Sequence, residues 1–255
     1  MKPNDRQQQI LSWLRAMRRE WRVDEIAAGL GVSPLTIRRD LDQLASENLV
    51  LRTHGGCIHA GRVAMETEYH QRVATHFDLK QAIGANAAGE VREGDVILIS
   101  DGSTCFHLAS HLGQCGAVTV YTNSLTMASE VNRFSHVRLR LLGGEVRRDQ
   151  FCLGGGMLDR NLDQVEFDTV FLGADKVDPT GRCLVDDETS ARTAQLMLRR
   201  GKRAILLADH TKVGGTGHVV YGTLSDFDLW ITSKGLPAAL RGKLSRQTTI
   251  REVKT

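Results

Sequence analysis

The stretch Val32–Leu44, VSPLTIRRDLDQL, decides how the first part of this 255-residue chain folds. Ser33 is a favourable N-cap residue, and Pro34 follows at the first helical position, where a missing N–H costs nothing. Large apolar residues recur at the spacing of one helix face, at Ile37, Leu41 and Leu44. This periodicity predicts a helix that presses one stripe onto a small core and exposes its opposite face.

The exposed face of this helix carries side chains suited to a DNA groove. Rotation by about 100° per residue places the following residues on that face or its flanks: Leu35, Thr36, Arg38, Arg39, Asp42 and Gln43. An ordinary amphipathic surface helix also carries arginines for solubility. The helix alone therefore leaves both interpretations open.

The neighbouring segments favour the DNA-binding interpretation. Asp24–Leu30 has the pattern of a short helix, and Gly31-Val32 fits the tight turn of a helix-turn-helix. Leu49–His59 contains two β-prone runs broken by Gly55-Gly56, which predicts a hairpin. A further helix over Arg6–Arg19 precedes them. This order of elements predicts a winged helix.

The sequence V-S-x-x-T-I-R-R-D-L from Val32, followed by R-x-H-G-G from Arg52, resembles the DeoR family of bacterial transcriptional regulators. Arg52 and His54 at the hairpin are candidates for phosphate contacts, because a wing reaches the flanking groove. The expected DNA-binding residues are Ser33, Leu35, Thr36, Arg38, Arg39, Gln43, Arg52, His54 and Gly55. The arginines of the first helix are either phosphate contacts or solvated surface.

The composition limits the possible classes of protein but does not point to one function. A net charge of +3 supports nucleic-acid binding only weakly. The five cysteines show no C-x-x-C pair or zinc spacing, so we expect reduced thiols and no metal. No apolar run approaches the roughly 18 residues of a membrane helix, and the polar N-terminus lacks a signal-peptide core. We therefore expect a cytoplasmic protein without a cofactor.

The second half of the chain alternates strand and helix patterns. The expected strands are Val96–Ser100, Val118–Thr122, Val137–Leu142, Asp168–Asp175, Arg203–Asp209 and Leu229–Thr232. The expected helices are Asp78–Glu90, Phe106–Leu112, Leu125–Asn132 and Asp187–Arg200. Near-continuous apolar strands between helices predict a mostly parallel sheet covered on both faces. The fold class is thus α/β, with domains at 1–59 and 78–255 joined by a linker at 60–77.

Polar motifs follow these strands at the edge where ligands of open α/β sheets bind. The turn Ser100–Cys105 is suited to an anion, although many such turns are polar only because they cap helices. Lys212 suits a phosphate, Asp175 and Asp209 suit sugar hydroxyls, and Asn123 suits either. Asp186, Asp187 and Glu188 are either ligand contacts or favourable charges at a helix start. Gly154-Gly155-Gly156 matches no nucleotide fingerprint and is interpreted as close backbone packing.

The resemblance to the DeoR family extends through this half. Its effector domain, which is similar to ribose-5-phosphate isomerases, carries D-x-G-[ST]-T, T-N-S, L-G-G, G-A-D and D-x-[ST]-K motifs, and implies a phosphorylated sugar as ligand. The expected effector-binding residues are Asp101, Gly102, Ser103, Thr104, Cys105, Thr122, Asn123, Ser124, Gly143, Gly144, Asp175, Glu188, Asp209 and Lys212. Cys105 and His210 depart from the family pattern and put the details of ligand choice in doubt.

Two functions from different classes fit the sequence. The first is a repressor of a carbohydrate operon that a sugar phosphate releases from double-stranded operator DNA. The second is a sugar-phosphate isomerase with an added DNA-binding domain. An isomerase needs a base beside the substrate C–H, and Gly181–Glu188 lacks the glycine cradle expected there, although Glu188 is a possible base. A nucleoid protein would leave the pocket motifs unused. The resemblance also implies a homo-oligomer, a dimer or a higher even multiple.

Overall fold

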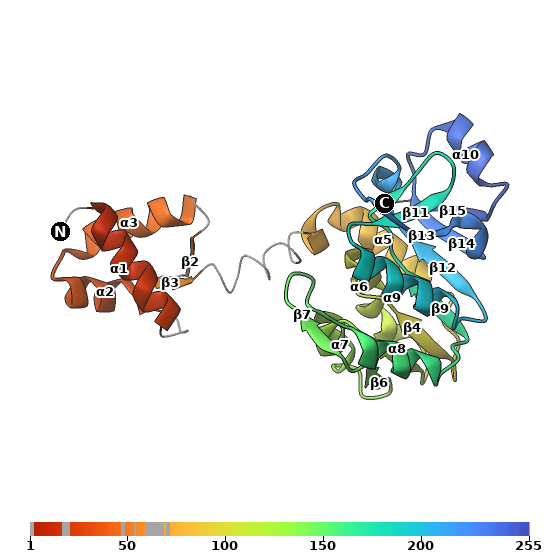
Figure 1. The fold of residues 1–255 in the computed structure, drawn as a ribbon, viewed down its shortest axis with the longest axis horizontal. Coiled ribbons are helices and arrows are strands. Elements are labelled where there is room, and N and C mark those ends of the chain that lie inside the picture. Colours follow the sequence, from red (N-terminus) through yellow and green to blue (C-terminus); the bar gives the residue numbers. More distant parts are fainter. Residues whose placement is uncertain are drawn as a thin grey trace. The chain divides into compact units, whose positions relative to one another are not determined.

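The computed structural model describes residues 3–16, 21–46, 49–53, 55–59, 69 and 72–254. The chain forms two compact units, Met1–Glu68 and Tyr69–Thr255 (Figure 1). Of the expected linker, residues 69 and 72–77 are described, and they belong to the second unit. Tyr69 is buried there, and α5 begins at Phe77.

The first unit is a winged helix. Its helices are α1 (Pro3–Ala16), α2 (Val23–Leu30) and α3 (Pro34–Ser46). Its strands are β1 (Trp21–Arg22), β2 (Val50–Arg52) and β3 (Gly56–His59), in the order β1-β3-β2 with antiparallel pairing. The hairpin β2-β3 is the predicted wing. Strand β1 was not predicted, because a two-residue strand shows no periodicity.

Local contacts explain how the turn and the wing of this unit form. Gly31 ends α2 with φ +64°, a left-handed conformation that glycine adopts without strain. The Ser33 hydroxyl then accepts a hydrogen bond from Thr36 N at 3.2 Å, which caps α3 as predicted. In the wing, a Cβ at Gly56 would lie 2.0 Å from the Trp21 carbonyl oxygen. Only glycine therefore lets β3 lie so close to β1.

The core of the first unit joins all three helices. The residues predicted to face inward from α3, Ile37, Leu41 and Leu44, are at most 1% exposed. They pack with Ile10, Leu14, Ile26 and Val50 in one apolar cluster. A polar contact crosses the edge of this cluster, because the buried Asp40 carboxylate accepts hydrogen bonds from the Arg6 guanidinium. This ion pair fastens α1 to α3.

The second unit is built on a seven-stranded parallel sheet in the order β15-β14-β12-β9-β4-β5-β6 (Figure 1). The strands are β4 (Val96–Ile99), β5 (Thr119–Thr122), β6 (Arg138–Leu141), β9 (Thr169–Leu172), β12 (Ala204–Leu207), β14 (Leu229–Ser233) and β15 (Thr249–Val253). Six of these seven strands were predicted. The predicted α/β class with a mostly parallel sheet is confirmed.

Helices cover both faces of the sheet, as the apolar strands predicted. They are α5 (Phe77–Ala88), α6 (Ser103–Ala109), α7 (Leu125–Val131), α8 (Gly156–Asp163), α9 (Glu188–Leu198) and α10 (Ala238–Leu244). Neighbouring residues of one strand enter different cores. On β9, Phe171 packs with α5, α6 and α7, whereas Val170 and Leu172 pack with α8, α9 and α10. Both faces of the strand are therefore buried.

Smaller elements surround the sheet, and the sequence patterns predicted none of them. A hairpin consists of β7 (Glu145–Arg147) and β8 (Cys152–Gly154), and a second sheet has the order β10-β11-β13. Its strands are β10 (Lys176–Val177), β11 (Arg182–Val185) and β13 (Val219–Thr223). Three short 3₁₀ helices are η1 (Leu112–Gln114), η2 (His210–Lys212) and η3 (Leu224–Asp226). The segment Gly154-Gly155-Gly156 joins β8 to α8, and Gly154 lies against Gly144.

Candidate DNA-binding and effector-binding sites

The outer face of α3 exposes the side chains predicted for DNA reading. Arg38 and Arg39 are exposed, and Leu35 near the start of the helix is 58% exposed although it is apolar. These residues lie opposite the buried stripe of Ile37 and Leu41. The helix therefore presents two cations and one apolar side chain to solvent, a combination that can contact base edges and a thymine methyl group.

Three other predicted residues, in α3 or at its cap, already have partners within the unit. The hydroxyls of Ser33 and Thr36 lie 2.8 Å apart and form part of the helix cap. Gln43 Oε1 accepts a hydrogen bond from Gln7 Nε2 at 2.9 Å, which holds this amide against α1. Gln43 must therefore release or share this hydrogen bond before its Oε1 atom can contact a base.

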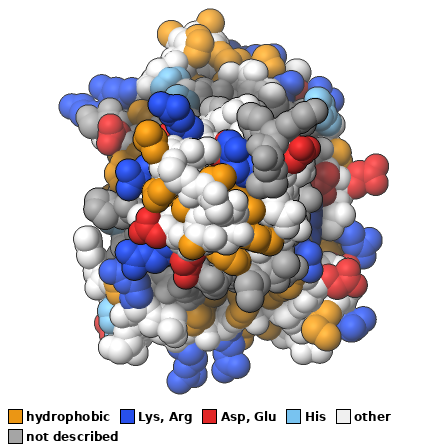
Figure 2. Space-filling model, turned by 90° about the vertical axis from the view of Figure 1, so that its left-hand side faces the viewer, with side chains coloured by type: hydrophobic (Ala, Val, Ile, Leu, Met, Phe, Trp, Pro, Cys, Tyr) orange, Lys and Arg blue, Asp and Glu red, His pale blue; other side chains and the backbone are white. Residues whose placement is uncertain are grey.

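The wing carries one predicted cation beside the recognition helix. Arg52 Nε lies 3.2 Å from Asp42 Oδ1 of α3. The Gly55 carbonyl oxygen accepts a hydrogen bond from Val23 N at 3.0 Å, which fixes the tip of the hairpin to α2. His54 lies outside the described residues. On the face shown in Figure 2, Lys and Arg side chains lie among acidic and apolar ones, in keeping with the small net charge.

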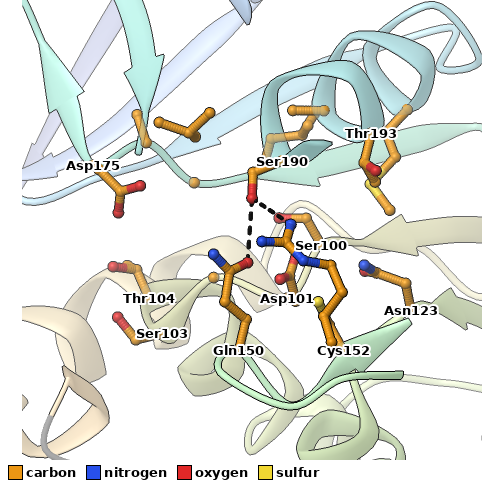
Figure 3. A pocket seen from close by; sticks show the side chains of 18 of the residues that line it. Ser100, Asp101, Ser103, Thr104, Asn123, Gln150, Cys152, Asp175, Ser190 and Thr193 are labelled. Carbon is orange, nitrogen blue, oxygen red and sulfur yellow. Dashed lines mark hydrogen bonds between the residues drawn. The ribbon is translucent and has the colours of Figure 1, made fainter. Parts of the chain in front are cut away.

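A polar cavity opens in the second unit at the carboxyl ends of β4, β5 and β9 (Figure 3). The expected residues that line it are Asp101, Gly102, Ser103, Thr104, Asn123, Asp175 and Lys212. In Figure 3, Ser103, Thr104 and Asp175 lie on one side of the cavity and Asn123 on the other. The strands therefore bring together hydroxyls, an amide, carboxylates and an ammonium group from distant parts of the sequence.

The other expected effector-binding residues do not line this cavity. Cys105 is fully buried beneath the turn, with its Sγ 3.6 Å from Ser100 Oγ. Thr122 and Ser124 are also fully buried, and their hydroxyl oxygens fix the start of α7 by accepting hydrogen bonds from Ser124 N and Met127 N, respectively. The side chains of Cys105, Thr122 and Ser124 therefore shape the turns, whereas their neighbours Thr104 and Asn123 line the cavity.

Gly143, Gly144, Glu188 and Asp209 likewise lie outside the lining. Gly143 N donates to Asn161 Oδ1 at 3.0 Å, and Glu188 is exposed at the start of α9. Asp209 is fully buried and caps η2, since its Oδ1 atom accepts from Thr211 N at 3.0 Å. The cap places Lys212, which does reach the cavity, at the end of η2.

The hairpin β7-β8 supplies cavity residues that the sequence patterns missed. Arg147 and Gln150 line the cavity, and Arg147 Nη2 lies 3.0 Å from Asp187 Oδ2. Ser190 Oγ joins the network: it accepts from Arg147 Nη1 at 2.8 Å and donates its one proton to Asp187 Oδ2 at 2.7 Å, with Gln150 Oε1 lying 3.2 Å away (Figure 3). These contacts fasten the hairpin to α9 on one wall of the cavity. These residues lie in the hairpin and not in a turn directly after a strand of the main sheet, so no pattern pointed to them.

The carboxylates of this region differ in their electrostatic environment. Burial by itself would raise the pKa of Asp187, but hydrogen bonds from Ser190 and the charge of Arg147 lower it to about 2. Burial and then the charge of Asp186 raise the pKa of Asp175, against the opposing charges of Lys212 and Arg72. Asp187 is thus ionised over most of the pH range, whereas burial disfavours the charged form of Asp175.

Asn123 has unused hydrogen-bonding capacity in the cavity. Its Nδ2 donates to the Leu153 carbonyl oxygen at 3.0 Å. Its Oδ1 atom has no partner, although the residue is only 1% exposed. A buried polar atom without a partner costs about 1 to 3 kcal/mol, so a ligand hydroxyl that donates to Oδ1 would remove an existing penalty.

The described part of the chain shows no metal site or disulfide. No group of three or more His, Cys, Asp or Glu side chains among those residues is placed to hold a metal ion. The five cysteines are free, and burial raises the pKa of the Cys152 thiol that lines the cavity. Among the described helices, none is long and apolar enough to cross a membrane.

A winged helix joined to an α/β unit with a polar cavity defines the class of ligand-responsive transcriptional regulators. Residues 6–62 match the DeoR-like helix-turn-helix domain, and residues 75–234 match the DeoR C terminal sensor domain. The chain belongs to the DeoR family of transcriptional regulators, as the sequence motifs indicated.

Named relatives agree with this assignment. The HTH-type transcriptional regulator GlpR of Haloferax volcanii is 32% identical, over 87% of this chain and 87% of the relative. The glycerol-3-phosphate regulon repressor of Escherichia coli is also 32% identical, over 85% of this chain and 86% of the relative.

A solved ribose 5-phosphate isomerase A from Methanocaldococcus jannaschii matches with a TM-score of 0.40 and 19% identity, over 53% of this chain and 54% of that one.

Proposed function

We propose that this regulator is a repressor that binds operator DNA through α3 and the wing, and that a phosphorylated sugar or sugar derivative releases it. The observation that carries the proposal is the composition of the cavity. It joins the ammonium group of Lys212 and the hydroxyls of Ser103 and Thr104 to the unpartnered Oδ1 of Asn123. Such a set can bind an anion at one end of a molecule and hydroxyls at the other.

Within this proposal, each side chain has one task. Lys212, Ser103 and Thr104 bind the phosphate, and Asn123 and Asp175 bind the hydroxyls of the carbon skeleton. The name of one relative, the glycerol-3-phosphate regulon repressor of Escherichia coli, supports a small phosphorylated ligand. The cytoplasm, where DNA and sugar phosphates are both present, is the expected place of action.

A thermal-shift screen tests the ligand class. The probes are glycerol 3-phosphate, ribose 5-phosphate, glucose 6-phosphate and fructose 1-phosphate, each paired with its unphosphorylated parent. A ligand that binds only the folded state at about 100 times its Kd stabilises the protein by about 2.7 kcal/mol, which raises the Tm of the second unit by several degrees. Stabilisation by one ester but not by its parent supports the proposal. Equal effects of ester and parent contradict the phosphate assignment.

We further propose that the chain is not an isomerase. Glu188, the base suggested by the sequence, is exposed and does not line the cavity. Asp175 does line the cavity. We assign its carboxylate to a ligand hydroxyl, whereas an isomerase would need it as a base beside an acidic C–H. Incubation of the purified protein with ribose 5-phosphate should yield no ribulose 5-phosphate above the rate without protein. Saturable formation of the ketose would contradict this.

A further inference from the structure

Arg72 is a cavity residue that follows shortly, in the sequence, after the end of the first unit. It lines the cavity together with Lys212 and Asp175, and the boundary falls between Glu68 and Tyr69. The Arg72 guanidinium carbon lies 5.9 Å from the centroid of the Tyr69 ring, within the range of a cation–π contact. Among the described residues, the other lining groups come from sequence positions 100–212.

The backbone around Arg72 is fastened to the helices beside the cavity. The Arg72 carbonyl oxygen accepts a hydrogen bond from the buried Lys80 ammonium group of α5. The Val73 carbonyl oxygen accepts one from His107 Nε2 of α6 at 3.1 Å. Burial lowers the pKa of His107, which favours the neutral ring, and the carbonyl acceptor at Nε2 requires the proton on that nitrogen. The segment that follows the unit boundary is therefore fixed to α5 and α6.

The same helix α6 carries both this attachment and part of the cavity. It begins at Ser103 and Thr104, which line the cavity, and continues to Phe106 and His107. The Phe106 ring meets the Tyr69 ring edge to face, with centroids 6.5 Å apart. Tyr69 is 1% exposed, so this contact belongs to the core of the second unit. A ligand at the start of α6 thus lies about one helical turn from the residues that contact Tyr69 and Val73.

We propose that Arg72 couples effector binding to DNA binding, an inference that rests on the proposed function. An anionic group held by Lys212 and Ser103 attracts the Arg72 guanidinium and competes with its position over Tyr69. The free protein and the liganded protein then differ in the contact between the Arg72 guanidinium and the Tyr69 ring. A ligand shifts an equilibrium only through contacts that differ between the two states, and Arg72 supplies such a contact.

The test separates ligand affinity from coupling. Wild type, Arg72→Gln, Arg72→Lys and Arg133→Gln are compared, the last being an exposed arginine of the segment after α7 that lies outside the cavity. The DNA is a duplex that the wild-type protein selects from a random library. The ligand is the phosphate ester that stabilises the wild type most among glycerol 3-phosphate, ribose 5-phosphate, glucose 6-phosphate and fructose 1-phosphate. Fluorescence anisotropy gives the duplex Kd with and without saturating ester, and their ratio measures the coupling.

We expect Arg72→Gln to bind the duplex normally and to bind the ester more weakly than wild type, and at an ester concentration that saturates the variant to show a coupling ratio at least about tenfold smaller than that of wild type. A tenfold change corresponds to about 1.4 kcal/mol of coupling free energy. Arg72→Lys keeps a point charge without the planar fork and should retain an intermediate ratio. Arg133→Gln should match the wild type. If Arg72→Gln does not fold, Arg72→Lys decides the question through its ratio.

Three outcomes would overturn the inference. The first is an unchanged ratio in Arg72→Gln, or in Arg72→Lys where only that variant folds. The second is a lower ester affinity of Arg72→Gln together with a wild-type coupling ratio at an ester concentration that saturates the variant, since Arg72 would then serve affinity alone. The third is a wild type that no ester stabilises, which would reject the proposed function itself and the inference with it.

Discussion

Arg52 of the wing and Asp42 of the recognition helix form an ion pair, with 3.2 Å between Arg52 Nε and Asp42 Oδ1. The Asp42 carboxylate therefore places a negative charge on the surface that we expect to face DNA. It also engages Arg52, which we expect to bind phosphate. DNA binding must therefore compete with this pair. Both side chains are partly exposed, so the ion pair is worth at most about 1 kcal/mol.

Replacing Asp42 should therefore strengthen DNA binding without changing sequence preference. Asp42→Asn frees Arg52 for phosphate and removes a repulsive charge, so affinity for any duplex should rise about two- to fivefold at low salt. Arg52→Ala should instead weaken all duplexes alike and reduce the slope of log K against log salt by about one. Anisotropy titrations over a salt series measure both effects. Unchanged affinity in Asp42→Asn would show that Arg52 does not contact the DNA backbone.

Replacing Arg39, unlike replacing Arg52, should reduce sequence preference, because Arg39 lies on the outer face of α3. Arg39→Ala should cost about 1 to 3 kcal/mol on the preferred duplex and much less on random DNA. The ratio of the two Kd values, measured for wild type and variant, reports the loss of sequence preference. Preserved discrimination in Arg39→Ala would move the base contact to another exposed residue, with Leu35 the first to test.

The recognition helix and the main sheet could be predicted because their residues follow a strong period. Ile37, Leu41 and Leu44 all face one core, and the strands β4, β9 and β12 are apolar on both faces. Other elements carry no such signal. Strand β1 has two residues, and β10, β11 and β13 are short strands interrupted by polar and glycine residues.

The cavity was predicted in part for a related reason. Some of its residues follow main-sheet strands, among them Ser103, Asn123 and Asp175. They were predicted because ligands of open α/β sheets bind at the carboxyl ends of strands. The same motifs also contain residues that fold the turn, such as Cys105 and Thr122, and sequence does not separate the two roles. Arg147 reaches the cavity from a hairpin beside the main sheet, and Arg72 from a segment without a period, so neither could be found.

The low pKa of Asp187 makes a prediction about acid stability. Its carboxylate is ionised down to about pH 2 in the folded protein, against an ordinary value near 3.8. Its contribution is therefore fully present above about pH 4 and is lost as the pH falls toward 2. Asp187→Asn removes the contact with Arg147 but keeps a capping side chain for α9.

Urea unfolding of the second unit should show this directly. The free energy of unfolding of Asp187→Asn should lie below that of wild type near pH 7, and the difference should shrink as the pH approaches 2. Because Asp187 is partly exposed, solvent screening keeps the difference small. A difference that stays constant between pH 5 and about 2 would mean that the carboxylate charge does not stabilise this network.

We predict that the regulator is a symmetric oligomer in solution. One winged helix contacts few base pairs, and two copies related by a twofold axis can bind both halves of a palindromic site. Light scattering should therefore give twice the 28.1 kDa chain mass, or a higher even multiple. A 28.1 kDa particle at micromolar concentration, both with and without the selected duplex, would exclude this organisation.

Lys212 should decide whether the ligand releases the DNA. A phosphate bound by Lys212 and by the turn at Gly102–Thr104 gains charge-assisted hydrogen bonds of about 1.5 to 3 kcal/mol each. Loss of two such bonds lowers affinity by roughly two to four orders of magnitude. The unphosphorylated parent should therefore fail to release the selected duplex, whereas the stabilising ester succeeds.

Lys212→Ala should fold and bind the duplex but resist release by the ester. The matched control is Lys243→Ala, which removes an exposed lysine of α10 outside the cavity and should respond like wild type. The measurement is a titration of the protein–duplex complex with ester and parent, followed by anisotropy. Equal potency of ester and parent, or normal release in Lys212→Ala, would mean that hydroxyl contacts at Asn123 and Asp175 select the ligand and that the turn only caps α6.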